Sequence, residues 1–145
     1  MSSRVCFLFL QMGVSSSVIA HRLKSIGVLC LSRYQMRAYR DRFHMKSLVE
    51  IHHVIPRCCA NHKLIHFHGF DTEGPGNFIM MPSAKGSRTL KLRPNRVVHS
   101  GGHMKYNKYV RSCMDSMGPC PLEFSEFVST LHHRLRHDKE TLPWN

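Results

Sequence analysis

The sequence predicts an α+β fold in which two short β-strands are flanked by amphipathic helices. Two short runs rich in apolar residues, 47–56 and 77–82, have the length and boundaries of strands. The segments before and after them carry apolar residues at helical spacing. The chain has 145 residues, 42% of them hydrophobic, which allows one modest core and excludes a large multi-domain enzyme.

We expect the elements in a definite order, read from periodicity and from helix and strand breakers. The first half of the chain is expected to hold a helical region from 15 to about 45, a strand in 47–56 ended by Pro56, a short helix within 57–70 and turns over 69–76. The second half is expected to hold a second strand at 77–82, a polar basic loop over 83–95, and a helix over 96–117 ended by Gly118 and Pro119. The last element is an amphipathic helix over 122–137, in which Phe124, Phe127, Val128, Leu131 and Leu135 recur at helical spacing. This last helix is expected to cap the core.

These elements divide the chain into four parts. They are an apolar N-terminal segment (1–14), a basic helical segment (15–46), the main α+β domain with its C-terminal capping helix (47–137) and a tail (138–145).

The basic helical segment has two interpretations. Its expected apolar face comprises Val18, Ile19, Leu23 and Ile26, followed by Leu31, Tyr34, Met36 or Tyr39, and Phe43. Ser15 to Ser17 are candidate N-caps, and Gly27 stands where a first helix would end. The layout is similar to a transposase-type helix-turn-helix, which would read DNA. Two amphipathic helices with solvated charges would give the same pattern, so both interpretations stay open.

The cysteines and the N-terminal residues indicate in which cellular compartment the protein is expected. None of the six cysteines forms a C-x-x-C pair, and scattered thiols favour a reducing environment. Arg4 followed by an apolar run is similar to a signal peptide, but Gln11 and Gly13 interrupt it. We therefore expect an intracellular rather than a secreted protein. No apolar run is long enough to span a bilayer, and we expect no membrane partner.

Positive charge dominates the composition. The chain has 21 Lys+Arg against 9 Asp+Glu, a formal net charge of +12, and such a surplus attracts polyanions. Nucleic acid is the expected partner. The alternative is that the basic residues only keep the protein soluble.

Histidine is unusually frequent, at 12 of the 145 residues. Adjacent and four-apart histidine pairs arise by chance at this frequency, so the order of the motifs matters more than any one spacing. A His-His pair ends the first expected strand, Asn77 opens the second, and His99 and His103 lie where a helix is expected to begin. Histidines four apart share one face of a helix and can point at one ion. Neighbours on a strand point to opposite sides, so only one of His52 and His53 would face that ion. This order is the arrangement of a ββα-metal site.

At these residues the chain resembles the HNH/endonuclease VII superfamily of His-Me finger nucleases, and within it the subgroup named for an Ala-His-His motif. The matching stretches are 51–56, 69–71 leading into 76–82, and 99–103 followed by Tyr106 and Tyr109. The resemblance covers about 49–135. One departure is that Glu50 and Ile51 replace the small residue that usually precedes the histidine pair.

The resemblance implies a fold and a site. The fold would be a ββα-metal (His-Me finger) core with flanking amphipathic helices. His52, His99 and His103 would bind one divalent metal ion, His53 would be the general base, and Asn77 would hold the catalytic loop. We expect a backbone carbonyl to hold the second ring nitrogen of His53. Three imidazoles suit Zn, Ni, Co or Mn, whereas relatives often use Mg, so the identity of the metal stays open.

The function implied is a metal-dependent endonuclease that hydrolyses phosphodiester bonds, with DNA as the expected substrate. Candidate cations for gripping the phosphate backbone are Arg57, Lys85, Arg88, Arg96 and Lys105, each of which is alternatively a solvated surface charge. Two other functions stay open: a catalytically inactive nucleic-acid-binding protein on the same scaffold, and a binding module with a structural metal. Relatives with this core include toxins, mobile-element enzymes and viral nucleases, and a toxin would have an inhibitor or immunity partner. We expect structural roles for the remaining clusters, His62, His66 and His68, and His132, His133 and His137.

Overall fold

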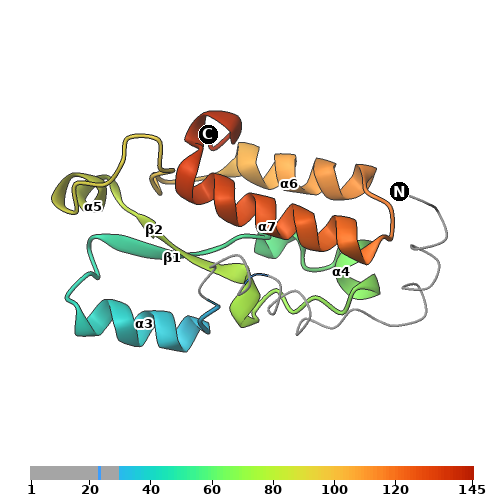
Figure 1. Ribbon diagram of the computed structural model, residues 1–145, viewed down its shortest axis with the longest axis horizontal. Coiled ribbons are helices and arrows are strands. Elements are labelled where there is room, and N and C mark those ends of the chain that lie inside the picture. The colour runs from blue at the N-terminus through green and yellow to red at the C-terminus, as the bar shows by residue number, and fades with distance from the viewer. Residues whose placement is uncertain (1–22, 24–29) are drawn as a thin grey trace.

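The computed structural model describes residues 23 and 30–145 of the chain (Figure 1). Its elements are α3 (Arg33–Arg42), β1 (Val49–His53), the 3₁₀ turn η1 (Arg57–Cys59), α4 (Lys63–Phe67), η2 (Pro75–Asn77), β2 (Phe78–Pro82), α5 (Ala84–Thr89), α6 (Met104–Ser116), α7 (Pro121–His137) and η3 (Lys139–Thr141). The expected apolar segment 1–14, the N-caps Ser15 to Ser17 and the first helix of the possible helix-turn-helix lie outside the described residues, apart from Leu23.

β1 and β2 pair as an antiparallel sheet of two strands, as the apolar runs predicted. The register places Val49 opposite Pro82 and His53 opposite Phe78. Val49 and Ile51 in β1, and Phe78 and Ile79 in β2, favour an extended backbone. Helices combined with this small sheet agree with the predicted α+β class.

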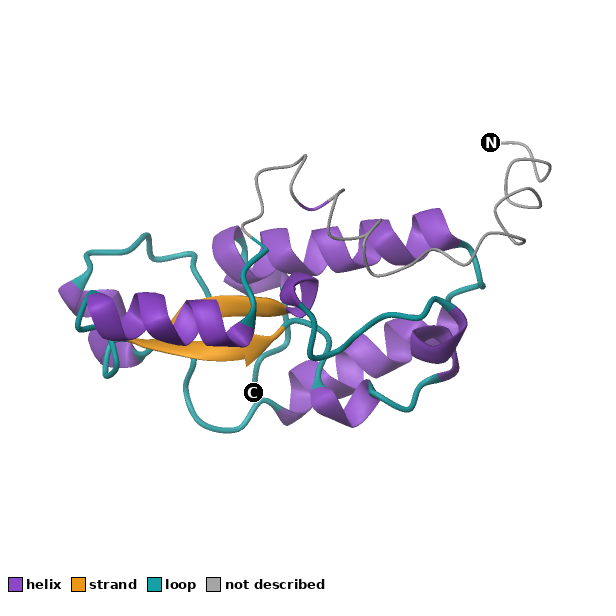
Figure 2. Cartoon of the chain, turned by 90° about the horizontal axis from the view of Figure 1, so that it is seen from below, coloured by secondary structure: helices purple, strands orange, loops and turns teal. Residues whose placement is uncertain are grey.

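Helices cover the sheet on two sides (Figures 1 and 2). α3 packs against β1, and α7 packs against β2 from the opposite side, with α6 beside it. The core lies between the sheet and α6 and α7, and Val110, Phe124 and Val128 are each fully buried in it. The predicted amphipathic C-terminal helix is therefore confirmed. Among the described residues, no helix combines the length and apolarity that crossing a membrane would require.

α6 is tied to the end of β1 by a buried tyrosine. Tyr106 is fully buried, and its hydroxyl donates a hydrogen bond of 2.6 Å to the carbonyl of Val54. Burial raises the pKa of Tyr106, so the hydroxyl keeps the proton that it donates. This bond fixes the start of α6 beside the histidine pair.

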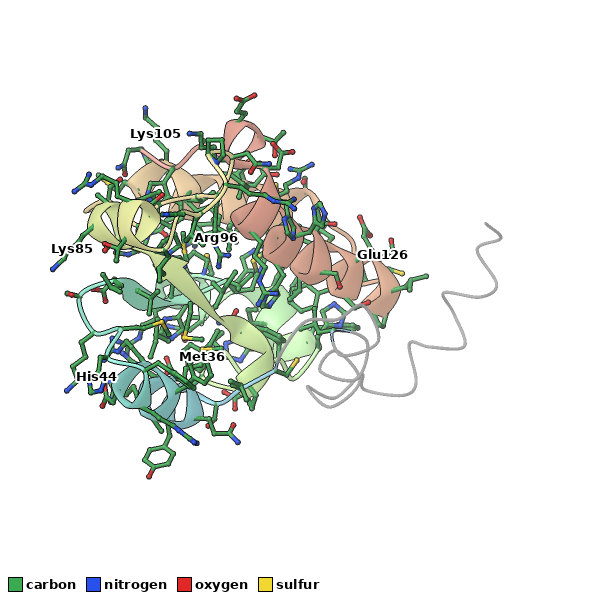
Figure 3. All side chains as sticks on the ribbon, turned by 60° about the vertical axis from the view of Figure 1, so that its left-hand side comes forward. Met36, His44, Lys85, Arg96, Lys105 and Glu126 are labelled. Carbon is green, nitrogen blue, oxygen red and sulfur yellow. The ribbon has the colours of Figure 1, made fainter. Side chains whose placement is uncertain are left out.

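α3 begins at a capping box formed by Ser32 and Gln35. It buries Met36, but Tyr34 is 80% exposed and Phe43 is 52% exposed. The expected apolar face is therefore wrong at these two aromatic residues. α3 packs against β1, and Met36 is the one residue of this helix that is buried (Figure 3).

The expected loop over 83–95 is wrong in its first half, where α5 forms. The Ser83 side chain caps the helix by accepting a hydrogen bond from the Gly86 amide at 3.0 Å. Gly86 itself is buried against the backbone of Leu48, where a Cβ atom would collide with the Leu48 carbonyl. The contact between Gly86 and Leu48 thus accompanies a helix that the polar sequence of this segment did not predict.

The expected helix over 96–117 begins later than predicted, because α6 starts at Met104. The preceding residues instead follow β2: the His99 amide donates to the Pro82 carbonyl at 2.8 Å, and His99 forms an isolated bridge with Ser83. The backbone then turns through Gly101, whose φ of +64° favours glycine.

Candidate active site

Three histidines from separate elements converge beside the sheet. His52 comes from β1, His99 from the bridge beside β2, and His103 from the residue that precedes α6. Each offers one ring nitrogen, and these nitrogens lie within 4.8 Å of one another. Among the described residues no other such group of three metal-binding side chains occurs.

The geometry that brings His99 and His103 together differs from the expectation. They do not occupy one helical face, because His99 lies outside α6 and His103 is its N-cap residue. The bridge to Ser83 and the turn through Gly101 bring the two rings to a centroid distance of 5.9 Å. The prediction that His99 and His103 lie together is therefore confirmed, but a turn brings them together and not a shared helical face.

His52 is the most buried member of the cluster, with 5% exposure. Burial, with smaller contributions from the neighbouring His103, His99 and His53 rings, lowers the pKa of His52 to about 3. Its Nδ1 atom is buried without a hydrogen-bond partner among the described residues. A neutral imidazole with an unsatisfied nitrogen is the form that binds a metal ion.

His103 and His99 complete the donor set. The Nδ1–H of His103 donates to the Oδ1 of Asn107 at 2.9 Å, which leaves the lone pair on Nε2. Burial, with a further contribution from His103, lowers the pKa of His99, so this ring is also held neutral. Three imidazoles with converging nitrogens fit a divalent transition-metal ion.

His53 lies next to the cluster and has a different environment. Its Nε2–H donates to the Oε1 of Glu73 at 2.9 Å, and its ring packs against Phe78 with a centroid distance of 4.8 Å. Among the described residues the partner of this nitrogen is a carboxylate, which corrects the expected backbone carbonyl. With the proton on Nε2, the lone pair of the neutral ring is on Nδ1.

Asn77 binds the chain that follows β1. It is fully buried, and its Oδ1 accepts from the Ile55 amide at 2.6 Å. Its Nδ2 donates to the Ile55 carbonyl at 2.9 Å and to the Thr72 carbonyl at 2.8 Å. Asn77 therefore fixes the loop that carries Glu73 relative to the end of β1.

An open pocket of about 270 Å³ joins the two histidine environments. It is lined by Ile51, His52, His53, Pro56, Arg57, Cys58, His99, His103 and Asn107. The Arg57 side chain is 72% exposed, and its Nε lies 3.4 Å from the Oε1 of Glu73. A polar group placed in this pocket would meet imidazole nitrogens on one side and a guanidinium on another.

The other candidate cations lie away from this pocket. Lys85 and Lys105 extend outward at the edges of the molecule, whereas Arg96 lies among the ribbons (Figure 3). Arg96 donates to the Met80 carbonyl at 3.2 Å, and burial lowers the pKa of its guanidinium. Arg88 lies on α5. Arg57 is thus the member of the predicted set that the structure brings to the histidines.

Several of the other histidines have structural partners, as expected. His62 caps α4 by accepting from the Leu64 amide at 3.2 Å, and its Nε2–H donates to Asp115 at 3.0 Å. The Nε2–H of His132 donates to the Gly76 carbonyl at 2.9 Å.

Three residues of the site carried little or no signal in the sequence. Glu73 is one acidic residue in a turn, Asn107 lies four positions after His103, and Trp144 belongs to the expected tail. A search for carboxylates within the turn after the histidine pair would have found Glu73, because a basic chain has few of them. Trp144 packs against all three histidine rings of the cluster.

Comparison with protein families gives one finding for this chain. Residues 34–118 match the model of the AHH family, described as a nuclease family of the HNH/ENDO VII superfamily with conserved AHH. No curated protein and no solved structure matches the chain. The matched range includes β1, β2 and α6, and therefore all three histidines of the cluster.

Proposed function

The chain belongs to the AHH family, a nuclease family of the HNH/ENDO VII superfamily, and from this we propose that it is a metal-dependent endonuclease that hydrolyses phosphodiester bonds of DNA. The observation that carries the proposal is one pocket lined both by the three-histidine cluster and by His53, whose ring is hydrogen-bonded to Glu73. A purely structural metal centre would not need the second pair.

In this proposal His53 is the general base. Glu73 accepts the Nε2–H and holds the ring in one tautomer, so that Nδ1 takes the proton from a water molecule. The water oxygen attacks the phosphorus atom, and the bond from phosphorus to the 3′ oxygen breaks. The released 3′ oxygen takes a proton from solvent water, so the products are a 5′-phosphate and a 3′-hydroxyl. Asn77 acts on this step indirectly, because it fixes the loop that carries Glu73.

His52, His99 and His103 would hold the divalent cation. When bound, a cation of this kind supplies positive charge to the phosphate and to the departing oxygen. The donor set favours Zn, Mn or Ni over Mg, since imidazole nitrogen is a poor partner for Mg. Asn107 keeps His103 in the tautomer whose Nε2 is free.

Two basic features would bind the DNA backbone. Arg57 lines the pocket, and we expect its exposed guanidinium to bind the scissile phosphate. The first residue of α3, Arg33, lies 3.9 Å from Glu73, and α3 also carries the exposed Arg37 and Arg42, which we expect to bind the DNA backbone outside the pocket. Replacing Arg37 and Arg42 together with alanine should weaken DNA binding and reduce its salt dependence.

Cleavage of supercoiled plasmid tests the proposal. Purified protein with Mn²⁺, Ni²⁺, Zn²⁺ or Mg²⁺ should nick the plasmid, and a chelator should stop the reaction. His53→Ala should lower the rate by about 100-fold or more. His66→Ala is the matched control, because His66 is an exposed histidine on α4 and should leave the rate unchanged.

Two results would contradict the proposal. Salt-dependent binding of DNA without cleavage under any metal would favour a nucleic-acid-binding protein on a nuclease scaffold. Cleavage of RNA without cleavage of either single-stranded or double-stranded DNA would contradict DNA as the substrate. The proposed roles of His53 and of the metal would then apply to RNA.

A further inference from the structure

Trp144 contacts every ring of the histidine cluster. Its ring centroid lies 5.2 Å from that of His52, 5.9 Å from that of His99 and 5.3 Å from that of His103. It also lies 5.3 Å from the ring of Tyr106. One indole thus touches three side chains that come from three separate parts of the chain.

The segment that carries Trp144 is anchored on both sides of the indole. Leu142 is 4% exposed and belongs to the hydrophobic core. The Nδ2 of Asn145 donates to the Ser100 carbonyl at 3.0 Å, within the loop that joins His99 to His103. The position of the indole is therefore fixed by the core and by the metal-binding loop.

Trp144 stands outside the pocket that the histidines line. Its Nε1–H is buried and has no hydrogen-bond partner among the described residues, which is unfavourable for stability. An aliphatic side chain would fill this space without burying an unpaired N–H group. A large flat ring is instead suited to restricting the rotation of three neighbouring imidazoles.

We propose that Trp144 is a positioning residue of the metal centre, which holds His52, His99 and His103 in the converging arrangement that binds the cation. The inference rests on the proposed function, since it requires that the cluster bind a divalent metal. It adds that the segment 142–145 supports the histidine cluster from outside the pocket. Trp144 acts through the ligands and does not touch the substrate.

Fluorescence of the intact protein gives the first test, because Trp144 is the single tryptophan of the chain. Titration with Co²⁺ or Ni²⁺ should quench its emission until one ion is bound per chain. The same titration of His99→Ala should give no saturable quenching, and that of His66→Ala should match the wild-type chain. Calorimetry on the same samples measures metal binding independently.

Substitution of the indole gives the second test. Trp144→Ala should weaken Zn²⁺ binding about 10- to 100-fold by calorimetry, as loss of a residue that supports metal ligands does. Trp144→Phe keeps a flat ring and should keep most of the affinity. Val128→Ala, a core change in α7 away from the cluster, should lower the melting temperature without changing the affinity.

The outcomes separate this inference from the proposed function. No metal binding to the wild-type chain in calorimetry would overturn both. Metal binding without quenching, or Zn²⁺ affinity that Trp144→Ala leaves unchanged, would overturn the role of Trp144 alone. An equal loss of affinity in Trp144→Phe and Trp144→Ala would also overturn the proposed action through ring shape.

Discussion

The Oε1 of Glu73 accepts a hydrogen bond of 2.9 Å from the Nε2 of His53, across 20 positions of sequence. The same oxygen lies 3.4 Å from the Nε of Arg57, and the second carboxylate oxygen lies 3.9 Å from Arg33. One carboxylate thus orients the proposed base and holds the arginine that lines the pocket. Glu73 therefore contacts both His53, the proposed base, and Arg57, the proposed phosphate-binding residue.

Removing this carboxylate should impair cleavage more than it impairs folding. We expect Glu73→Ala to lower kcat about 10- to 100-fold, because the tautomer of His53 is no longer fixed. Glu73→Gln retains an acceptor oxygen and should lose less. Rates are measured on plasmid at saturating metal, with the exposed Glu140→Ala as control. Equal rates for Glu73→Ala and the wild-type chain would exclude the orienting role.

Replacing Asn77 should impair both stability and activity. Asn77→Ala leaves the amide and carbonyl of Ile55 and the carbonyl of Thr72 without their partner. A buried group left unsatisfied costs about 1–3 kcal/mol, so we expect a loss of roughly 3 kcal/mol in urea unfolding. Asn95→Ala removes an exposed hydrogen bond to the His137 carbonyl and should cost less than about 1 kcal/mol. Similar losses in the two variants would show that Asn77 does not anchor the loop.

Local sequence signals predicted the parts of the fold that depend on local preferences. The strands were predictable because β-branched and apolar residues fill runs that end at prolines. α7 was predictable because Phe124, Val128 and Leu131 recur at helical spacing and all three are buried. The histidine cluster was predictable from the order of its motifs, which does not depend on the exact limits of the elements.

The errors arose where distant contacts decide the backbone. α5 forms because Gly86 fits against Leu48, and His99 is held by the Pro82 carbonyl in place of a helical turn. Neither contact leaves a periodic signal. Trp144 reaches the cluster through the core packing of Leu142. The sequence therefore indicated the three histidines of the cluster, whereas the contact of Glu73 with His53 and the packing of Trp144 against the cluster required the fold.

Stability should fall in acid partly because of His132. Burial lowers the pKa of His132 to about 4, against 6.5 for a free histidine. Between these values the unfolded chain binds a proton that the folded chain excludes, so stability falls as the pH falls from about 6.5 to 4 and no further below that. This contribution is on the order of 3 kcal/mol. His132→Gln retains a donor for the Gly76 carbonyl and does not titrate, so it should lose less stability over this range.

Urea unfolding at pH 7 and pH 4.5, both without metal, measures this effect. His133→Gln is the matched control, because His133 is an exposed neighbour on the same helix and should behave like the wild-type chain. Parallel losses in His132→Gln and the wild-type chain would exclude His132 as a source of acid sensitivity.

Adding one methyl group at Gly86 should destabilise the end of the sheet that leads to His99. A Cβ atom there would collide with the backbone carbonyl of Leu48, which cannot rotate away as a side chain would. Overpacking of this kind costs about 1–3 kcal/mol, and we expect Gly86→Ala near the upper end of that range in thermal and urea unfolding. Gly102→Ala adds a Cβ atom that meets nothing within 4 Å, so this variant should have almost unchanged stability.

Because the Ser83 side chain accepts a hydrogen bond from the Gly86 amide and Ser83 also pairs with His99, Gly86→Ala should in addition weaken metal binding. An unchanged affinity in a destabilised Gly86→Ala variant would show that α5 supports the fold without positioning the site.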